Sequence, residues 1–135
     1  MSLHFVLTGS LEKVLPHVEP APWTEEAYPL PQGDCLNVQI AYMGDFEMCM
    51  PGDDRLFFSA KATEGVRVSL NPVGLSPVRM ACTANHDDDY ITHSPAMLPD
   101  VLLPYDAESG VRTLGGQWRS IWVEMQALEA GEQEI

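Results

Sequence analysis

Basic side chains are scarce in this chain: 7 Lys and Arg stand against 20 Asp and Glu, which gives a formal net charge of −13. A protein that binds a phosphate backbone or an anionic membrane surface needs clustered Lys and Arg. We therefore expect no direct contact with nucleic acid and none with a membrane. The acidity favours solubility, and an acidic inhibitor that mimics nucleic acid is one alternative.

Cysteine and long apolar runs are also scarce. An odd set of three cysteines without a C-x-x-C pair (Cys35, Cys49 and Cys82) is a poor disulfide framework, and we interpret all three as small apolar residues. No apolar run approaches the roughly 20 residues that span a bilayer. Met1 to Thr8 lacks the basic start and long apolar stretch of a signal peptide. These features favour a cytoplasmic protein in a reducing compartment.

Catalytic signatures are missing as well. The chain has no G-x-S-x-G nucleophile elbow, no H-E-x-x-H metal motif and no phosphate-binding loop, because Gly115-Gly116 is not followed by Lys and then Ser or Thr. The sequence therefore favours a protein that is not an enzyme. It predicts no cofactor, with a divalent metal as the alternative considered below.

Short apolar segments with period-two alternation run through most of the chain. In Leu36–Met43, Leu36, Val38, Ile40 and Tyr42 face one way and the intervening residues face the other, which is typical of a half-buried strand. Short links between such segments predict antiparallel pairing. We predict one domain over 1–135, an antiparallel β-sandwich or flattened barrel of roughly seven to nine strands. The other expected strands are 3–8, 46–50, 56–60, 66–70, 78–84 and 90–92, with an edge strand at 101–103 and a link at 71–77.

The segment 16–31 has a different character, since five prolines fall within it. Each proline removes a backbone donor and fixes φ, so neither a helix nor a central strand is expected. We predict an ordered, irregular arm anchored by Trp23 and Tyr28. Such an arm covers a sheet edge, lines a pocket or reaches a neighbouring subunit.

The last segment, 117–130, fits two structures. Trp118, Ile121, Trp122, Met125 and Leu128 recur at helical spacing, and the run from Met125 to Ala130 favours a helix intrinsically. The alternation of Ile121, Val123 and Met125 fits a strand. We predict a C-terminal helix packed on the β domain, with the strand as the alternative.

An acidic loop, 85–89, holds the densest set of metal-capable side chains. His86 and His93 flank a chain reversal, and with Asp87 and Asp89 they form the candidate metal site. Their spacing matches no established metal motif. A solvated acidic turn without metal is the simpler interpretation.

Three tryptophans are many for a chain of 135 residues. Trp23, Tyr28, Trp118 and Trp122 are candidates for an aromatic contact surface, with core packing as the simpler interpretation. Our functional prediction is a non-enzymatic binding or assembly module that binds a protein partner or itself through an edge strand or this aromatic surface. The alternatives are a small β-barrel enzyme or metal-binding protein that uses His86 and His93, and the nucleic-acid mimic.

Overall fold

The computed structural model describes residues 2–25, 27–45, 55–79, 91–92 and 95–134, and within them the chain forms strands and no helix. The prediction of a mainly β protein is confirmed. The seven strands are β1 (Leu3–Gly9), β2 (Cys35–Gly44), β3 (Arg55–Leu56), β4 (Val66–Val78), β5 (Ala96–Leu102), β6 (Val111–Arg112) and β7 (Arg119–Ala127).

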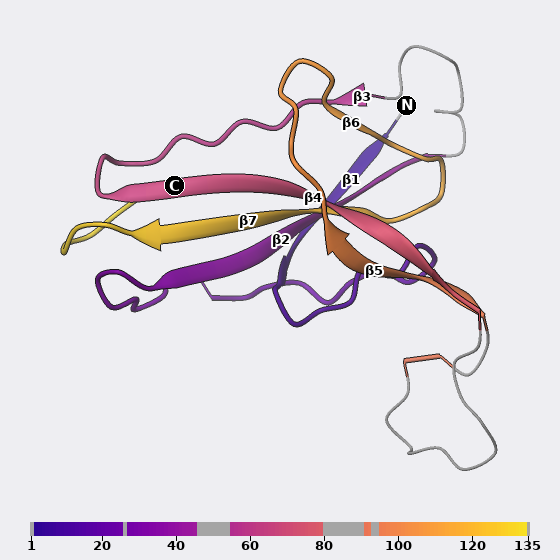
Figure 1. Ribbon diagram of the computed structural model, residues 1–135, viewed down its shortest axis with the longest axis horizontal. Coiled ribbons are helices and arrows are strands. Elements are labelled where there is room, and N and C mark those ends of the chain that lie inside the picture. Colours follow the sequence, from indigo (N-terminus) through magenta and orange to yellow (C-terminus); the bar gives the residue numbers. More distant parts are fainter. Residues whose placement is uncertain (1, 26, 46–54, 80–90, 93–94, 135) are drawn as a thin grey trace.

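Five of these strands form one antiparallel sheet in the order β1-β2-β7-β4-β5, and β3 pairs with β6 in a small two-stranded sheet (Figure 1). Within the described part of the chain the large sheet does not close, because β1 and β5 end it on opposite sides. The structure therefore shows antiparallel sheets, and the sandwich or flattened barrel stays a prediction.

The predicted C-terminal helix is wrong. Residues 119–127 form β7, the central strand of the large sheet, which pairs with β2 along one edge and β4 along the other. Ile121, Val123 and Met125 point to one side, as the strand alternative required. A central strand satisfies its backbone groups on both edges, and this tertiary pairing outweighs the helical propensity of the Met-Gln-Ala-Leu stretch.

The predicted link at 71–77 is also wrong, because β4 continues through it as a strand of 13 residues. Pro72 lies where the pairing of β4 passes from β7 to β5: it is the last residue opposite β7, and Val73 is the first opposite β5. A missing N–H is tolerated where a strand changes partners. Beyond this point β4 and β5 form a two-stranded ribbon that projects from the sheet (Figure 1).

Side-chain alternation divides the large sheet into two sides. On the side called here the apolar side, Val38, Val123 and Met125 are buried. Half-buried apolar side chains of β2 and β4 pack against these three residues. The opposite side is called here the arm side, because the proline-rich arm 16–31 crosses it. There Val14, Ala41 and Trp118 form a second buried cluster. The predicted alternation of Leu36–Met43 is thus confirmed, with both sides of β2 contributing to a core.

The proline-rich arm runs over the arm side and then along the outer edge of β1. Pro16 O accepts a hydrogen bond from Trp118 N, and the Thr8 hydroxyl donates to Ala21 O at 2.5 Å. Trp23 N donates to Leu7 O at 2.7 Å. The described residues of 16–31 form no strand or helix, so the arm is held by isolated hydrogen bonds to the sheet.

Candidate functional site

Strand β1 exposes a row of large apolar side chains at the edge of the sheet. Leu3, Phe5 and Leu7, here called the β1 row, are 39%, 53% and 46% exposed. The register places Phe5 opposite Tyr42 and Leu7 opposite Ile40, so the row continues the apolar side outward from the core. An apolar surface that extends from the core to an open edge is typical of a contact site for another protein.

The backbone of β1 also has groups directed away from the sheet. Ser2 O accepts from Asp45 N on the β2 side, whereas Leu7 O accepts from Trp23 N on the outer side. In an antiparallel ladder successive residues alternate between these directions, so the N–H and C=O of Leu3 and Phe5 point outward. Among the described residues, none bonds to these four groups.

The two edges of the sheet differ in how they discourage further pairing. The outer strand β5 contains Pro99 and has a register shift opposite Gly74 and Leu75, and Pro99 O accepts a hydrogen bond from Lys13 Nζ at 3.3 Å. Proline, a bulge and lysine are the usual means by which proteins block an edge strand. Strand β1 contains no proline, lysine or register shift over its seven residues. Within the described part of the chain, β1 is the edge that keeps unpaired backbone groups.

The start of β1 is fixed by a small polar cluster. His4 Nε2 lies 3.1 Å from Asp45 Oδ1, and Ser2 N donates to Asp45 Oδ2 at 3.0 Å. The hydrogen bond from His4, with a smaller contribution from Ser2 N, lowers the pKa of Asp45 below its usual value. His4 is the one titratable residue in β1, so the strand itself carries no carboxylate.

A shallow cavity of about 770 Å³ lies between the arm and the ends of β1 and β2. The Trp23 and Tyr28 rings line it with centroids 6.2 Å apart, and Trp23 Nε1 donates to Glu25 O. Its charged lining residues are Glu12, Glu25 and Asp34, all acidic. The arm therefore lines a cavity, and its Trp23 N occupies the outward C=O of Leu7 at one end of β1.

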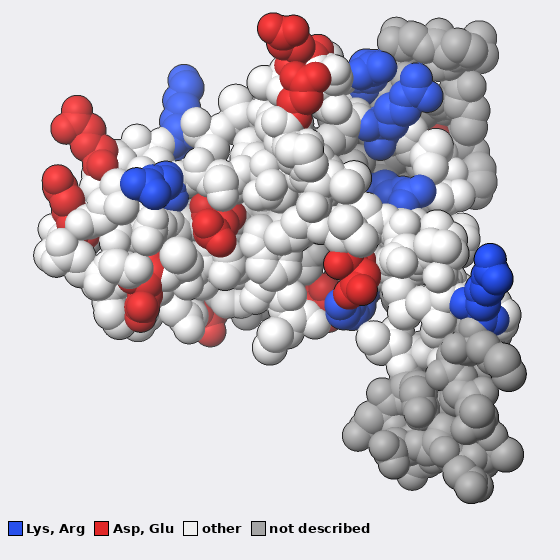
Figure 2. Space-filling model, viewed as in Figure 1, with Lys and Arg blue, Asp and Glu red and all other residues white. Residues whose placement is uncertain are grey.

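Positive charge gathers at the end of the molecule where β3 and β6 lie (Figure 2). Arg55 and Arg112 are direct cross-strand partners there, and Arg55 donates to Ser109 O. Arg119 is paired in register with Tyr42 at the start of β7. Burial raises the pKa of Tyr42 to about 12, with the Arg119 charge opposing the increase.

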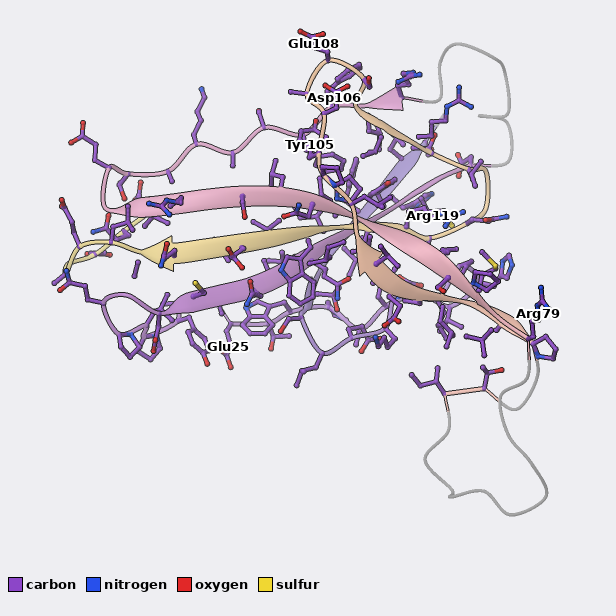
Figure 3. All side chains as sticks on the ribbon, viewed as in Figure 1. Glu25, Arg79, Tyr105, Asp106, Glu108 and Arg119 are labelled. Atoms are coloured by element: carbon purple, nitrogen blue, oxygen red, sulfur yellow. The ribbon has the colours of Figure 1, made fainter. Side chains whose placement is uncertain are left out.

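The loop between β5 and β6 carries Tyr105, Asp106 and Glu108 on the same end of the molecule (Figure 3). The Tyr105 hydroxyl accepts from Phe58 N and donates to Phe58 O, which ties the segment after β3 to this loop. The Ser109 hydroxyl and Glu108 N donate to the Asp106 carboxylate, and these bonds lower the pKa of Asp106. These contacts fix a turn and leave no obvious catalytic arrangement.

The candidate metal residues His86, Asp87, Asp89 and His93 lie outside the described residues, as does the whole acidic loop 85–89. Among the residues that are described, no three His, Cys, Asp or Glu side chains come close enough to hold an ion. Metal binding by the acidic loop stays a prediction. Cys35 is exposed and free at the start of β2, in contrast to the expected small apolar core residue.

The four candidate aromatic residues do not form one surface. Trp118 is 6% exposed and packs with Val14 and Ala41, whereas Trp23 and Tyr28 lie together at the arm cavity. The Trp122 indole donates to Asn37 Oδ1 at 3.2 Å on the arm side of the sheet. A contact role for any of them stays a prediction.

The β1 row was not identified from the sequence, although the strand itself was. Alternating Leu3, Phe5 and Leu7 indicate that one side of the strand is apolar, and such a side is normally assigned to the core. The missing information was the position of the strand in the sheet. A first strand without lysine or proline, followed by a proline-rich segment, is the signal that could have suggested an open edge.

The chain matches no known protein family and none of the curated proteins with which it was compared. Across the described residues no helix is long and apolar enough to cross a membrane. Function therefore has to be inferred from the geometry of the chain itself.

Proposed function

We propose that this protein is a non-enzymatic binding or assembly module whose contact surface is the β1 row at the edge of the sheet. The observation that carries the proposal is the exposure of Leu3, Phe5 and Leu7 beside a buried core on an edge strand without blocking features. Partners that add a strand to such an edge gain main-chain hydrogen bonds and bury the alternate side chains.

Charge supports the same surface. No carboxylate occurs among the residues that the register places on the apolar side of β1, β2 and β7, although the chain as a whole carries a net charge of −13. A partner at this position meets apolar side chains and no carboxylate from these three strands, so charge repulsion there is low.

The experiment compares binding of the apolar dye bis-ANS to three forms of the protein, each dilute enough that copies of the chain do not associate. The row variant Phe5→Ser/Leu7→Ser removes two exposed side chains of the β1 row. The control Leu11→Ser/Val18→Ser removes two apolar side chains outside β1, which are 96% and 55% exposed. We expect dye fluorescence to fall several-fold in the row variant and to persist in the control. Equal fluorescence in wild type and the row variant, with both folded by circular dichroism, contradicts the proposal.

A further inference from the structure

We propose that the partner at the β1 edge is a second copy of this chain, and that the two β1 strands pair antiparallel about a two-fold axis at His4. This inference rests on the proposed function and names its partner. It follows from three properties of the edge: which backbone groups are unpaired, which side chains flank them, and what charge they carry.

The backbone determines the register. Leu3 and Phe5 each direct an N–H and a C=O outward, whereas the outward C=O of Leu7 is already bonded to Trp23 N. An axis at His4 places Leu3 opposite Phe5 of the other copy and repeats this pair on the far side of the axis. Both pairs are of the hydrogen-bonded kind, so four inter-strand hydrogen bonds form without using the Leu7 C=O that Trp23 N occupies. An axis at Phe5 would instead require the occupied Leu7 C=O.

The side chains fit the same register. Across the axis, the exposed Leu3 side chain of one copy meets the exposed Phe5 side chain of the other on the apolar side of the joined sheet. Aromatic and aliphatic residues directly opposite each other are favourable cross-strand pairs. The pairing would be isologous, since the same residues contribute from each copy and the contact closes on itself.

Charge is compatible with this contact in a strongly acidic chain. Two copies, each with a net charge of −13, repel each other over most of their surfaces. Among the described residues the titratable groups beside the axis are His4 and Asp45 of each copy, and each Asp45 carboxylate is hydrogen-bonded to His4 and to Ser2 N within its own copy. The β1 edge is thus where two copies can approach without bringing unpaired carboxylates together.

Sedimentation equilibrium over a range of protein concentrations tests the association. We expect a dimer for wild type and for Leu11→Ser/Val18→Ser, and a monomer for Phe5→Ser/Leu7→Ser. Leu3→Pro removes an outward N–H without touching the β1–β2 ladder, so it should weaken the dimer by at least tenfold more than Leu3→Ala. Equal effects of the two Leu3 substitutions would show that the sheet sides pack together without edge pairing, and would overturn the inference.

Disulfide trapping tests the register. Opposite residues of a non-hydrogen-bonded pair have Cα atoms about 4.5 Å apart, which is within disulfide range. His4→Cys should therefore form an intermolecular disulfide readily, whereas Val6→Cys, two residues from the axis, should form none beyond that of wild type with its native cysteines. Trapping at Val6 and not at His4 would overturn the axis.

The outcomes separate this inference from the proposed function. If wild type is monomeric at every concentration while bis-ANS binding still depends on Phe5 and Leu7, the second copy is rejected and a different partner takes its place. If the dye also binds equally to the row variant, both proposals fail. A dimer that persists in the row variant places the contact elsewhere and likewise overturns the inference.

Discussion

At the scale of single residues, Tyr42 reports how completely β2 is enclosed. It is 3% exposed, its ring packs against Phe58 with centroids 5.5 Å apart, and its pKa is raised to about 12 by burial. The folded state therefore disfavours the phenolate more than the unfolded state does. The resulting stability is fully present below the unfolded value near 10 and is lost as the pH rises from there through about 12.

We expect ultraviolet difference titration to show a component from Tyr42 that ionises near pH 12. Tyr42→Phe should remove this component, and it should flatten the loss of stability between pH 10 and 12 measured by urea unfolding. Tyr28→Phe is the matched control, because Tyr28 is 49% exposed. If the late component survives in Tyr42→Phe, the buried position of Tyr42 is wrong.

Gln39 is a buried polar residue on the side of β2 that the alternation assigns away from the apolar core. Its Nε2 donates to Glu12 O at 2.8 Å and to Gly9 O at 3.2 Å, and its Oε1 accepts from the Ser120 hydroxyl at 2.9 Å. The Gln39 side chain thus connects the loop that follows β1, through Gly9 O and Glu12 O, to the centre of the sheet. Removing a buried hydrogen-bonded group is costly because its partners stay desolvated.

Gln39→Ala should destabilise the protein by about 2–4 kcal/mol, since three hydrogen bonds of a buried side chain are lost. This is comparable with the loss of about 2–5 kcal/mol expected for Ile40→Ala on the apolar side. Ser120→Ala, which removes one of the three bonds, should cost about 1 kcal/mol. Denaturant unfolding measures all three variants. A Gln39→Ala midpoint equal to that of wild type would show that the loop does not cover this residue.

At the scale of elements, the turn before β6 depends on a glycine. Gly110 has φ of +62°, and a Cβ placed there would lie 2.5 Å from Leu56 O on β3. Gly33, before β2, also has a positive φ of +91°, but a Cβ there would meet no atom within 4 Å. The two positions share the backbone requirement and differ in the space available, so they form a matched pair.

Gly33→Ala should cost about 1–2 kcal/mol from the positive φ alone. Gly110→Ala should cost clearly more, because the added methyl group also forces β3 away from β6. Thermal unfolding of the two variants gives the comparison. Equal losses would mean that the β3–β6 ladder adjusts freely, and would weaken the placement of Arg55 opposite Arg112.

At the scale of the whole molecule, self-repulsion governs how stability responds to salt. The chain carries 20 acidic against 7 basic residues, and the ion pairs within the described residues, His4–Asp45 and Lys13–Asp100, are both largely exposed. Exposed ion pairs contribute little, so screening removes more repulsion than attraction. Sodium chloride should therefore raise the thermal midpoint at pH 7, with potassium chloride as the control for a specific ion effect. A midpoint that falls with either salt contradicts this balance.

The sequence alone was sufficient for the local features of the fold. The alternation in Leu36–Met43 predicted β2 and both of its sides, because period-two patterning directly records which side chains are buried. The charge balance likewise followed from composition. The prolines in 16–31 predicted a segment outside regular structure because each proline removes a backbone donor.

Tertiary structure decided the features that depend on neighbours. Residues 119–127 carry both a helical and a strand pattern, and they form β7 because β2 and β4 lie ready to pair on either edge. β4 passes through Pro72 because its partner changes at that residue. The alternation of Leu3, Phe5 and Leu7 shows that one side of β1 is apolar. Only the sheet order shows that this side lies at an edge of the sheet. Burial depends on which strands are adjacent, and a strand's own sequence does not contain that information.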